Sequence, residues 1–195
     1  MKRLYVFILL SVICGALSAQ TIVYDMTVLG SKFGKMVVSR RVQDSIELYT
    51  LDAKGKATIL WMDFENETIQ EVRYKGGKLI SSSYKEIENG KTKKWNKVSY
   101  DGRQYQVESY AGRRSFNEVP QYSVISLYFA DPQQRARIFH EAEASYTGLK
   151  RIDANTLEIK NADGSRSVYR YDQGKLNTME FHLAIATVYM KRTGY

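Results

Sequence analysis

Cysteine is almost absent from this chain of 195 residues, and the single one, Cys14, lies close to the N-terminus. A lone cysteine excludes a disulfide within the chain. The stability of the fold must therefore come from the packing of a hydrophobic core and from the hydrogen bonds between strands.

Histidine is scarce as well, and the chain has only His140 and His182. The segment from residue 140 to 144 begins like the zinc-protease signature, in which two histidines one helical turn apart hold the metal and a glutamate acts as base. An alanine stands where the second histidine would be. We therefore predict no catalytic residues, no metal site and no cofactor. A hydrolase that uses His140 with Glu141 or Glu143 is the weakest functional hypothesis.

Long apolar runs are missing after the first twenty residues. Before that point, Lys2 and Arg3 precede an apolar run over residues 4–16, and small residues end the segment at Ala19, a pattern typical of a secretory signal peptide. The apolar run is shorter than the roughly 20 residues that a transmembrane helix needs. We expect a signal peptide over residues 1–19, cleaved after Ala19 or alternatively after Ser18.

The remaining residues, 20–195, are expected to form a single antiparallel β domain with no transmembrane span. The signal peptide predicts that this domain is exported, and that it is periplasmic or secreted.

Proline occurs twice, and Pro120 and Pro132 bracket the one later stretch in which apolar residues crowd together. Pro120 suits the first position of a helix, and Pro132 ends the segment soon after Phe129. A helix over residues 122–129 would present two adjacent apolar faces. A buried strand is the alternative, because a short apolar run fits both structures. We predict a short helix that packs against, or plugs, a large sheet.

In the rest of the chain, apolar and polar residues alternate as they do in strands with one buried face. We place turns at 30–34 and at residues 55, 76, 90 and 102. This spacing favours antiparallel hairpins over alternating strands and helices. The sequence therefore predicts a mainly β fold, an antiparallel β-roll or barrel-like meander with one short central helix.

The clearest hairpin surrounds Asp101-Gly102, a dipeptide that suits a type I′ turn. Val98 and Tyr100 before this turn are answered by Tyr105 and Val107 after it.

The segment 133–147 is ambiguous, since its composition allows a helix while Arg137 to His140 fits a strand. We favour a strand after a short turn. The last element, over residues 185–190, is expected to be a strand that closes the sheet, because it carries β-branched and aromatic side chains.

Aromatic residues are the feature with most functional information. The chain has 15 tyrosines, seven phenylalanines and two tryptophans. Tyrosine suits surfaces that are apolar on one side and form hydrogen bonds on the other, although it is also a common strand residue. We expect a ligand site for a lipid or glycolipid between the sheet and the central helix, lined by Tyr122, Ile125, Tyr128, Phe129, Trp61 and Trp95.

Positive charge exceeds negative charge, with 29 lysines and arginines against 21 acidic residues. Solvated strand ends and hairpin tips account for most of this excess. The alternative function is a structural or interaction protein of the cell envelope that binds a protein or polysaccharide through a basic face. Nucleic acid is not expected as a partner, because the predicted signal peptide directs the chain out of the cytoplasm.

Three short motifs resemble a family of exported bacterial β-proteins known only as a domain of unknown function. The motifs are Tyr24-Asp25 with the segment 30–36, Ser123 to Phe129 followed by Asp131-Pro132, and Tyr169-Arg170-Tyr171 with the segment 174–176. The resemblance implies a curved β fold with a helix on its concave side, and it implies no catalytic residues.

Overall fold

The computed structural model describes residues 18–59, 62–132, 134–183 and 186–194. The first 17 residues of the predicted signal peptide, with Cys14, lie outside the described residues, and so does Trp61. The predictions of export and cleavage therefore stay predictions.

In the described part of the chain, fourteen strands form one antiparallel sheet. The first eight are β1 (Ser18–Val28), β2 (Ser31–Gln43), β3 (Ile46–Ile59), β4 (Met62–Lys75), β5 (Lys78–Glu88), β6 (Lys91–Tyr100), β7 (Tyr105–Ser109) and β8 (Gly112–Phe116). The others are β9 (Arg137–His140), β10 (Ser145–Asp153), β11 (Thr156–Lys160), β12 (Arg166–Asp172), β13 (Lys175–His182) and β14 (Thr187–Gly194). The prediction of a mainly β antiparallel meander is confirmed.

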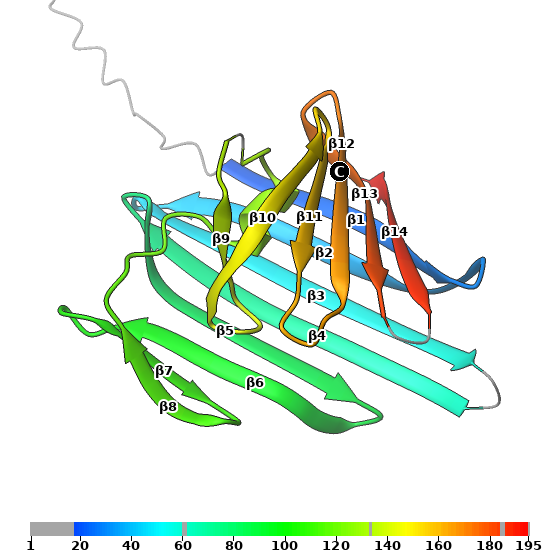
Figure 1. The fold of residues 1–195 in the computed structure, drawn as a ribbon, viewed down its shortest axis with the longest axis horizontal. Coiled ribbons are helices and arrows are strands. Elements are labelled where there is room, and N and C mark those ends of the chain that lie inside the picture. The colour runs from blue at the N-terminus through cyan, green and yellow to red at the C-terminus, as the bar shows by residue number, and fades with distance from the viewer. Residues whose placement is uncertain (1–17, 60–61, 133, 184–185, 195) are drawn as a thin grey trace, which may run out of the picture.

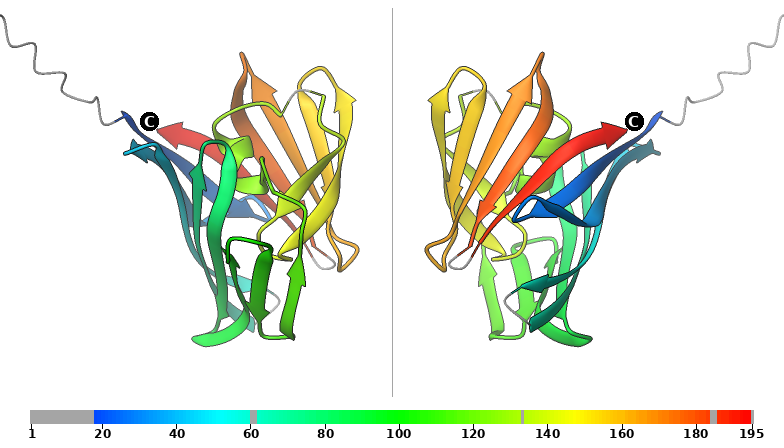
Figure 2. Two further views of the ribbon diagram at one scale, coloured as in Figure 1. Left: turned by 90° about the vertical axis from the view of Figure 1, so that its left-hand side faces the viewer. Right: turned by 90° about the vertical axis from the view of Figure 1, so that its right-hand side faces the viewer.

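The sheet has two arms that meet where the first strand pairs with the last. Its order is β8-β7-β6-β5-β4-β3-β2-β1-β14-β13-β12-β11-β10-β9. We call β1–β8 the first arm and β9–β14 the second arm. The shorter strands of the second arm lie over the long strands of the first, and the sheet bends between them (Figures 1 and 2). A curved sheet of this kind buries one face of each strand against the opposite arm.

The segment between β8 and β9 ties the arms together from inside. The Leu79 backbone N–H donates to Pro120 O at 2.9 Å, and the Phe139 N–H donates to Tyr122 O at 3.2 Å. A single-turn 3₁₀ helix, η1 (Val124–Tyr128), follows and is enclosed between the arms (Figure 2). Ser123 forms an isolated parallel bridge with Phe139 just before it.

The predicted helix is therefore shorter and more tightly wound than expected. It covers five residues instead of residues 122–129, and Ile125, Ser126, Leu127 and Tyr128 are all buried, so it has no exposed face. The bridge at Ser123 holds the backbone extended up to this residue, so the helix cannot begin earlier. A 3₁₀ turn is the usual form of such short helical segments.

The turn predicted at 30–34 lies earlier, at Leu29–Gly30, and the turn predicted at residue 55 is wrong, because Gly34 and Gly55 serve a close approach of strands. β2 runs through Gly34 and β3 runs through Gly55, and the two glycines face each other in the sheet. A Cβ atom on Gly34 would lie 2.2 Å from the carbonyl oxygen of Lys54, and one on Gly55 would lie 2.3 Å from the Phe33 ring. β3 and β4 instead meet beyond the pair Ile59 and Met62.

The Asp101-Gly102 hairpin is confirmed in its register but not in its turn type. Val98 pairs with Val107, and Tyr100 pairs with Tyr105. The loop has four residues in place of a two-residue type I′ turn, and the Asp101 carboxylate accepts hydrogen bonds from the backbone N–H groups of residues 103 and 104. The hydrogen bond from the Gln104 N–H, together with those from the Gln106 side chain and the Arg103 N–H, lowers the pKa of Asp101 to about 2.

The later predictions of strands are confirmed. β9 covers Arg137–His140, and β14 covers Thr187–Gly194 and pairs with both β1 and β13. In the described ranges, no helix has the length and hydropathy that a membrane span requires.

Candidate ligand-binding cavity

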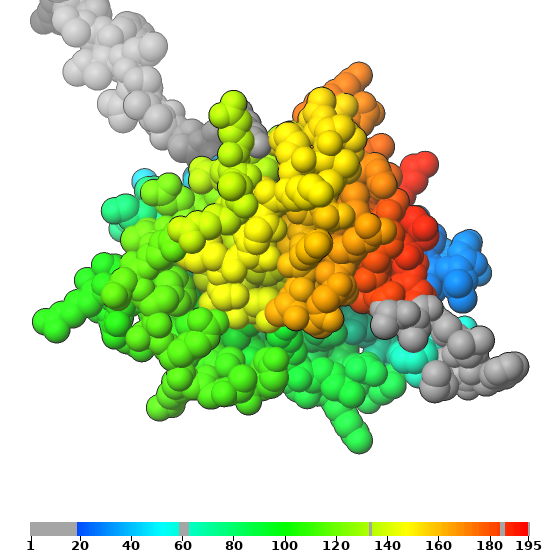
Figure 3. Space-filling view, in the orientation of Figure 1, coloured from blue at the N-terminus to red at the C-terminus, as the bar shows by residue number. Residues whose placement is uncertain are grey.

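The two arms enclose a cavity of about 560 Å³. Strands β1 to β6 of the first arm form one wall, and the second arm, with Val124 and Tyr128 of η1, forms the other. In the space-filling view, the yellow and orange strands of the second arm cover this region from the front (Figure 3). The cavity is therefore a feature of the concave interior.

The inner face of the first arm changes from apolar to polar between β3 and β4. Strand register places its side chains in lateral rows. From β1 to β6, one row is Tyr24, Met36, Ala53, Thr68, Glu86 and Lys94. The next row is Ile22, Val38, Leu51, Gln70, Tyr84 and Asn96. In these two rows, the inward side chains of β1 to β3 are therefore mostly apolar, and those of β4 to β6 can form hydrogen bonds.

The second arm has the same polarity. Phe181 of β13, with Val188 and Met190 of β14, lines the cavity beside the junction of the arms. His140 at the end of β9 and Asn161 after β11 line it farther from that junction. Because both arms are apolar near their junction and polar farther from it, the cavity has an apolar end and a polar end. We define the apolar end by Met26, Phe33, Met36, Leu51, Phe181 and Met190, and the polar end by Gln70, Tyr84, Glu86, Lys94, His140 and Glu143.

Glu141 fixes η1 against the inner surface. Its carboxylate is 1% exposed and accepts hydrogen bonds from the backbone N–H groups of Val124 at 3.2 Å and Ile125 at 3.1 Å. These donors belong to the first turn of the helix, where N–H groups have no partner within the helix. Burial raises the pKa of Glu141 to about 7, although the two N–H groups oppose this shift. The carboxyl therefore has a structural role in the wall of the cavity.

The polar end is closed by contacts between the arms. Lys94 of β6 forms a salt bridge with Glu143 at 2.5 Å. The buried Asn96 side chain donates to the carbonyl oxygens of Glu141 at 2.8 Å and Ala142 at 3.0 Å. Arg114 of β8 donates to the carbonyl oxygens of Glu143 and Ala144, both at 2.8 Å. The turn between β9 and β10 is thus held at a fixed position over the first arm.

The two histidines lie apart, on opposite faces of the sheet. His140 lines the cavity, and burial lowers its pKa. His182 is on β13 beside Phe181, which faces the cavity, so its own side chain lies on the other face. There it contacts Glu180 at 3.0 Å and Thr187 at 3.2 Å. The fold therefore does not bring together the two histidines that a two-histidine hydrolytic site would need.

Of the six predicted ligand residues, Tyr128 lines the cavity. Ile125 is fully buried in the core, and Phe129 packs against Tyr49 with ring centroids 5.5 Å apart. Trp95 alternates with the inward-facing Lys94 and Asn96, so it lies on the outer face, where it is 36% exposed. Trp61 lies outside the described residues.

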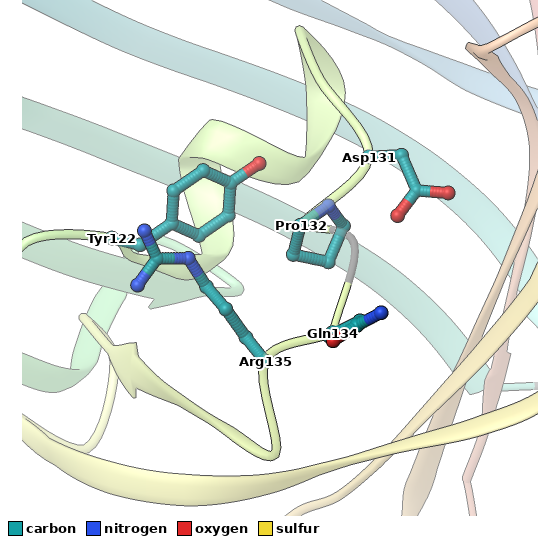
Figure 4. Close-up of a pocket in the computed structure, with 5 residues that line it drawn as sticks. All are labelled: Tyr122, Asp131, Pro132, Gln134 and Arg135. Atoms are coloured by element: carbon teal, nitrogen blue, oxygen red, sulfur yellow. The ribbon is translucent and has the colours of Figure 1, made fainter.

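Tyr122 belongs to a different pocket, open and of about 420 Å³ (Figure 4). The Arg135 guanidinium lies 5.0 Å from the centroid of the Tyr122 ring, and the Tyr122 hydroxyl donates to the Ala130 carbonyl oxygen at 2.7 Å. Asp131 at the same pocket forms a salt bridge with Arg151. The polar groups of this open pocket already bind one another, and its lining offers little apolar surface. The cavity between the two arms is therefore the stronger candidate site.

Three residues of the polar end, Gln70, Tyr84 and Lys94, were not singled out as site residues from the sequence. Gln70, Tyr84 and Lys94 occupy inward positions of β4, β5 and β6, and these strands also carry buried apolar residues on the same face, such as Val72 and Val98. Polar residues within the buried half of an alternating pattern are the signal that could have found them. Their meeting in one row required the strand register, which the sequence does not show.

Comparison with known protein families gives one match that covers nearly the whole described chain. The family model described as a domain of unknown function, DUF6134, matches residues 24–193. No curated protein and no solved structure matches the chain.

Proposed function

This chain belongs to the DUF6134 family, and we propose that it is a non-catalytic protein that binds an amphipathic small molecule, such as a lipid or glycolipid, between its two arms. The observation that carries this proposal is the polarity of the cavity. Its apolar end suits a hydrocarbon tail, and its polar end suits a head group.

The size of the cavity supports the same function. Sites for small molecules enclose roughly 300–1,000 Å³ and combine mostly apolar walls with a few placed polar groups. The cavity of about 560 Å³ lies within that range. The small inward residues Ala53, Gly55 and Ala57 of β3 widen it, because larger side chains at these positions would occupy the same space.

We also propose that the protein is exported and acts in the periplasm or outside the cell. The basic residues Lys2 and Arg3, the apolar run after them and the small residues ending at Ala19 support this. The N-terminal sequence of the protein purified from its native cells tests it. A start at Gln20 or Ala19 is expected, and an intact N-terminus would contradict export by this route.

Binding is tested with the uncharged fluorescent probe N-phenyl-1-naphthylamine, which brightens in apolar surroundings. The wild-type protein is compared with Ala57→Phe, which fills the cavity from β3. Thr58→Phe is the matched control, since Thr58 is the exposed neighbour on the outer face. We expect saturable binding by the wild type and by Thr58→Phe, and at least about tenfold weaker binding by Ala57→Phe, the effect of removing contacts worth about two buried methylenes or more.

The proposal is contradicted if the wild type fails to bind the probe. It is also contradicted if Ala57→Phe, with an unchanged circular dichroism spectrum, binds as well as Thr58→Phe.

A further inference from the structure

The polar end contains a buried hydrogen-bond donor with no partner in the described structure. Gln70 is 8% exposed and lines the cavity, and its Nε2 atom donates to no described group. An unpaired buried amide group is costly, by an amount comparable to a lost hydrogen bond. A molecule in the cavity that offers an oxygen atom to Gln70 would satisfy it.

A second group at this end is also unpaired. Nδ1 of His140 has no described partner, and burial lowers the pKa of this histidine, which favours the neutral ring. A neutral imidazole has one donor nitrogen and one acceptor nitrogen. A head group that both donates and accepts hydrogen bonds therefore suits His140 in either tautomer.

Carboxylates dominate the charge around the polar end. Besides Glu141, and apart from Glu65, whose side chain lies on the outer face of β4, the described lining residues include four carboxylates and one lysine: Glu86, Glu88, Glu143, Asp163 and Lys94. Lys94 is already paired with Glu143. This excess of negative charge contrasts with the net charge of +8 of the whole chain. Phosphate, sulfate or carboxylate heads would meet repulsion here.

A cationic head fails for a different reason. Ammonium groups donate hydrogen bonds but accept none, so they leave the Gln70 amide unpaired. Two of the carboxylates also have lysine partners, since Glu143 contacts Lys94 at 2.5 Å and Glu88 contacts Lys93 at 3.3 Å. Hydroxyl groups supply an acceptor for Gln70 and donors for the carboxylates at the same time.

We infer that the ligand head is uncharged and rich in hydroxyl groups, as in a sugar or a glycerol ester, and that Gln70 selects it. This inference rests on the proposed function, because it assigns the polar end of the same cavity. Gln70 donates to a hydroxyl oxygen of the head, and neighbouring carboxylates such as Glu86 accept from its hydroxyl hydrogens.

The test uses amphiphiles that share a dodecyl tail and differ only in the head: dodecyl maltoside, dodecyl sulfate and dodecyltrimethylammonium. Isothermal titration calorimetry with the purified protein, below the micelle-forming concentration of each, gives the three affinities. We expect dodecyl maltoside to bind at least about tenfold tighter than either charged amphiphile, because only its head satisfies the buried Gln70 donor, and dodecyl sulfate also meets charge repulsion.

A Gln70→Met variant separates a selecting role from a structural one. Methionine keeps the length of the side chain and removes the unpaired amide, so the thermal midpoint of the empty protein should stay the same or rise. Its preference for dodecyl maltoside over dodecyl sulfate should fall several-fold. The control is Ser82→Ala on β5. This change removes a buried hydroxyl that also has no described partner but does not line the cavity. That variant should keep the full preference.

Two results overturn the inference and leave the proposed function standing: equal affinities for the three amphiphiles, or an unchanged preference in Gln70→Met. Failure of all three amphiphiles and of the naphthylamine probe to bind would instead contradict the proposed function itself.

Discussion

Replacement of Glu141 by glutamine should change the stability of the protein by an amount that depends on pH. The carboxyl group is buried and holds the backbone N–H groups of Val124 and Ile125. Glutamine has nearly the same shape and one carbonyl acceptor oxygen, as the protonated carboxyl has. In mild acid, where the folded protein keeps Glu141 protonated, we therefore expect Glu141→Gln and the wild type to differ by less than about 1 kcal/mol.

The sign of the pH dependence follows from the raised pKa. In the folded protein the pKa of Glu141 is about 7, against 4.5 for the free side chain. Between these values the unfolded chain releases the proton while the folded protein keeps it, so wild-type stability falls as the pH rises. The contribution is fully present below about pH 4.5 and is lost as the pH passes through about 7, a total of about 3 kcal/mol. Glutamine does not titrate and shows no such loss.

The assay is urea unfolding, followed by intrinsic fluorescence, of both proteins between about pH 4.5 and pH 8, the range set by the two pKa values. Taking the difference between the proteins cancels the titration of other groups, including His140 next in the chain. The wild type should match Glu141→Gln in mild acid and become less stable than this variant, by up to about 3 kcal/mol, as the pH rises above about 7. A difference that stays constant over this range would refute the account of Glu141.

The remaining predictions concern strand packing and a hydrogen bond of η1. Gly34→Ala should destabilise the protein by about 1–3 kcal/mol, since its Cβ would meet backbone atoms of Lys54 and Gly55. The control Gly148→Ala, whose Cβ would meet nothing within 4 Å, should be neutral or slightly stabilising. Urea unfolding measures both variants, and equal effects would contradict the close approach of β2 and β3. Tyr171→Phe should cost about 1–2 kcal/mol, because the buried Tyr171 hydroxyl donates to the Leu127 carbonyl at 2.9 Å. The exposed Tyr100→Phe should cost less than about 0.5 kcal/mol, and a Tyr171→Phe variant as stable as this control would show that the contact with η1 contributes nothing.

The alternation of apolar and polar residues predicted the strands well where it is regular and where a glycine or asparagine marks the turn. Val98, Tyr100, Tyr105 and Val107 are an example, since alternation fixes which residues face inward and the turn fixes their register. The prediction was wrong where a residue acts through a distant partner. Gly55 suits a turn by its local sequence, and only its position opposite Gly34 shows that it permits a close approach within the sheet.

The candidate site was harder to predict, because its residues meet only through the order of the strands. Gln70 and His140 lie 70 positions apart in the chain and come together because the second arm folds over the first. Aromatic content indicated the central segment, and Tyr128 lines the cavity there. Trp95 was misplaced because its side of β6 depends on a register in which Lys94, Asn96 and Val98 face inward.

Native mass spectrometry of the protein purified from its own cells shows whether the cavity holds a ligand. We expect the wild type to carry a bound amphiphile in a one-to-one ratio, solvent extraction to yield a neutral, hydroxyl-bearing lipid, and Ala57→Phe to carry none. A wild-type protein that shows only its bare mass under gentle ionisation, and that binds neither the naphthylamine probe nor the dodecyl amphiphiles, would contradict the proposed function.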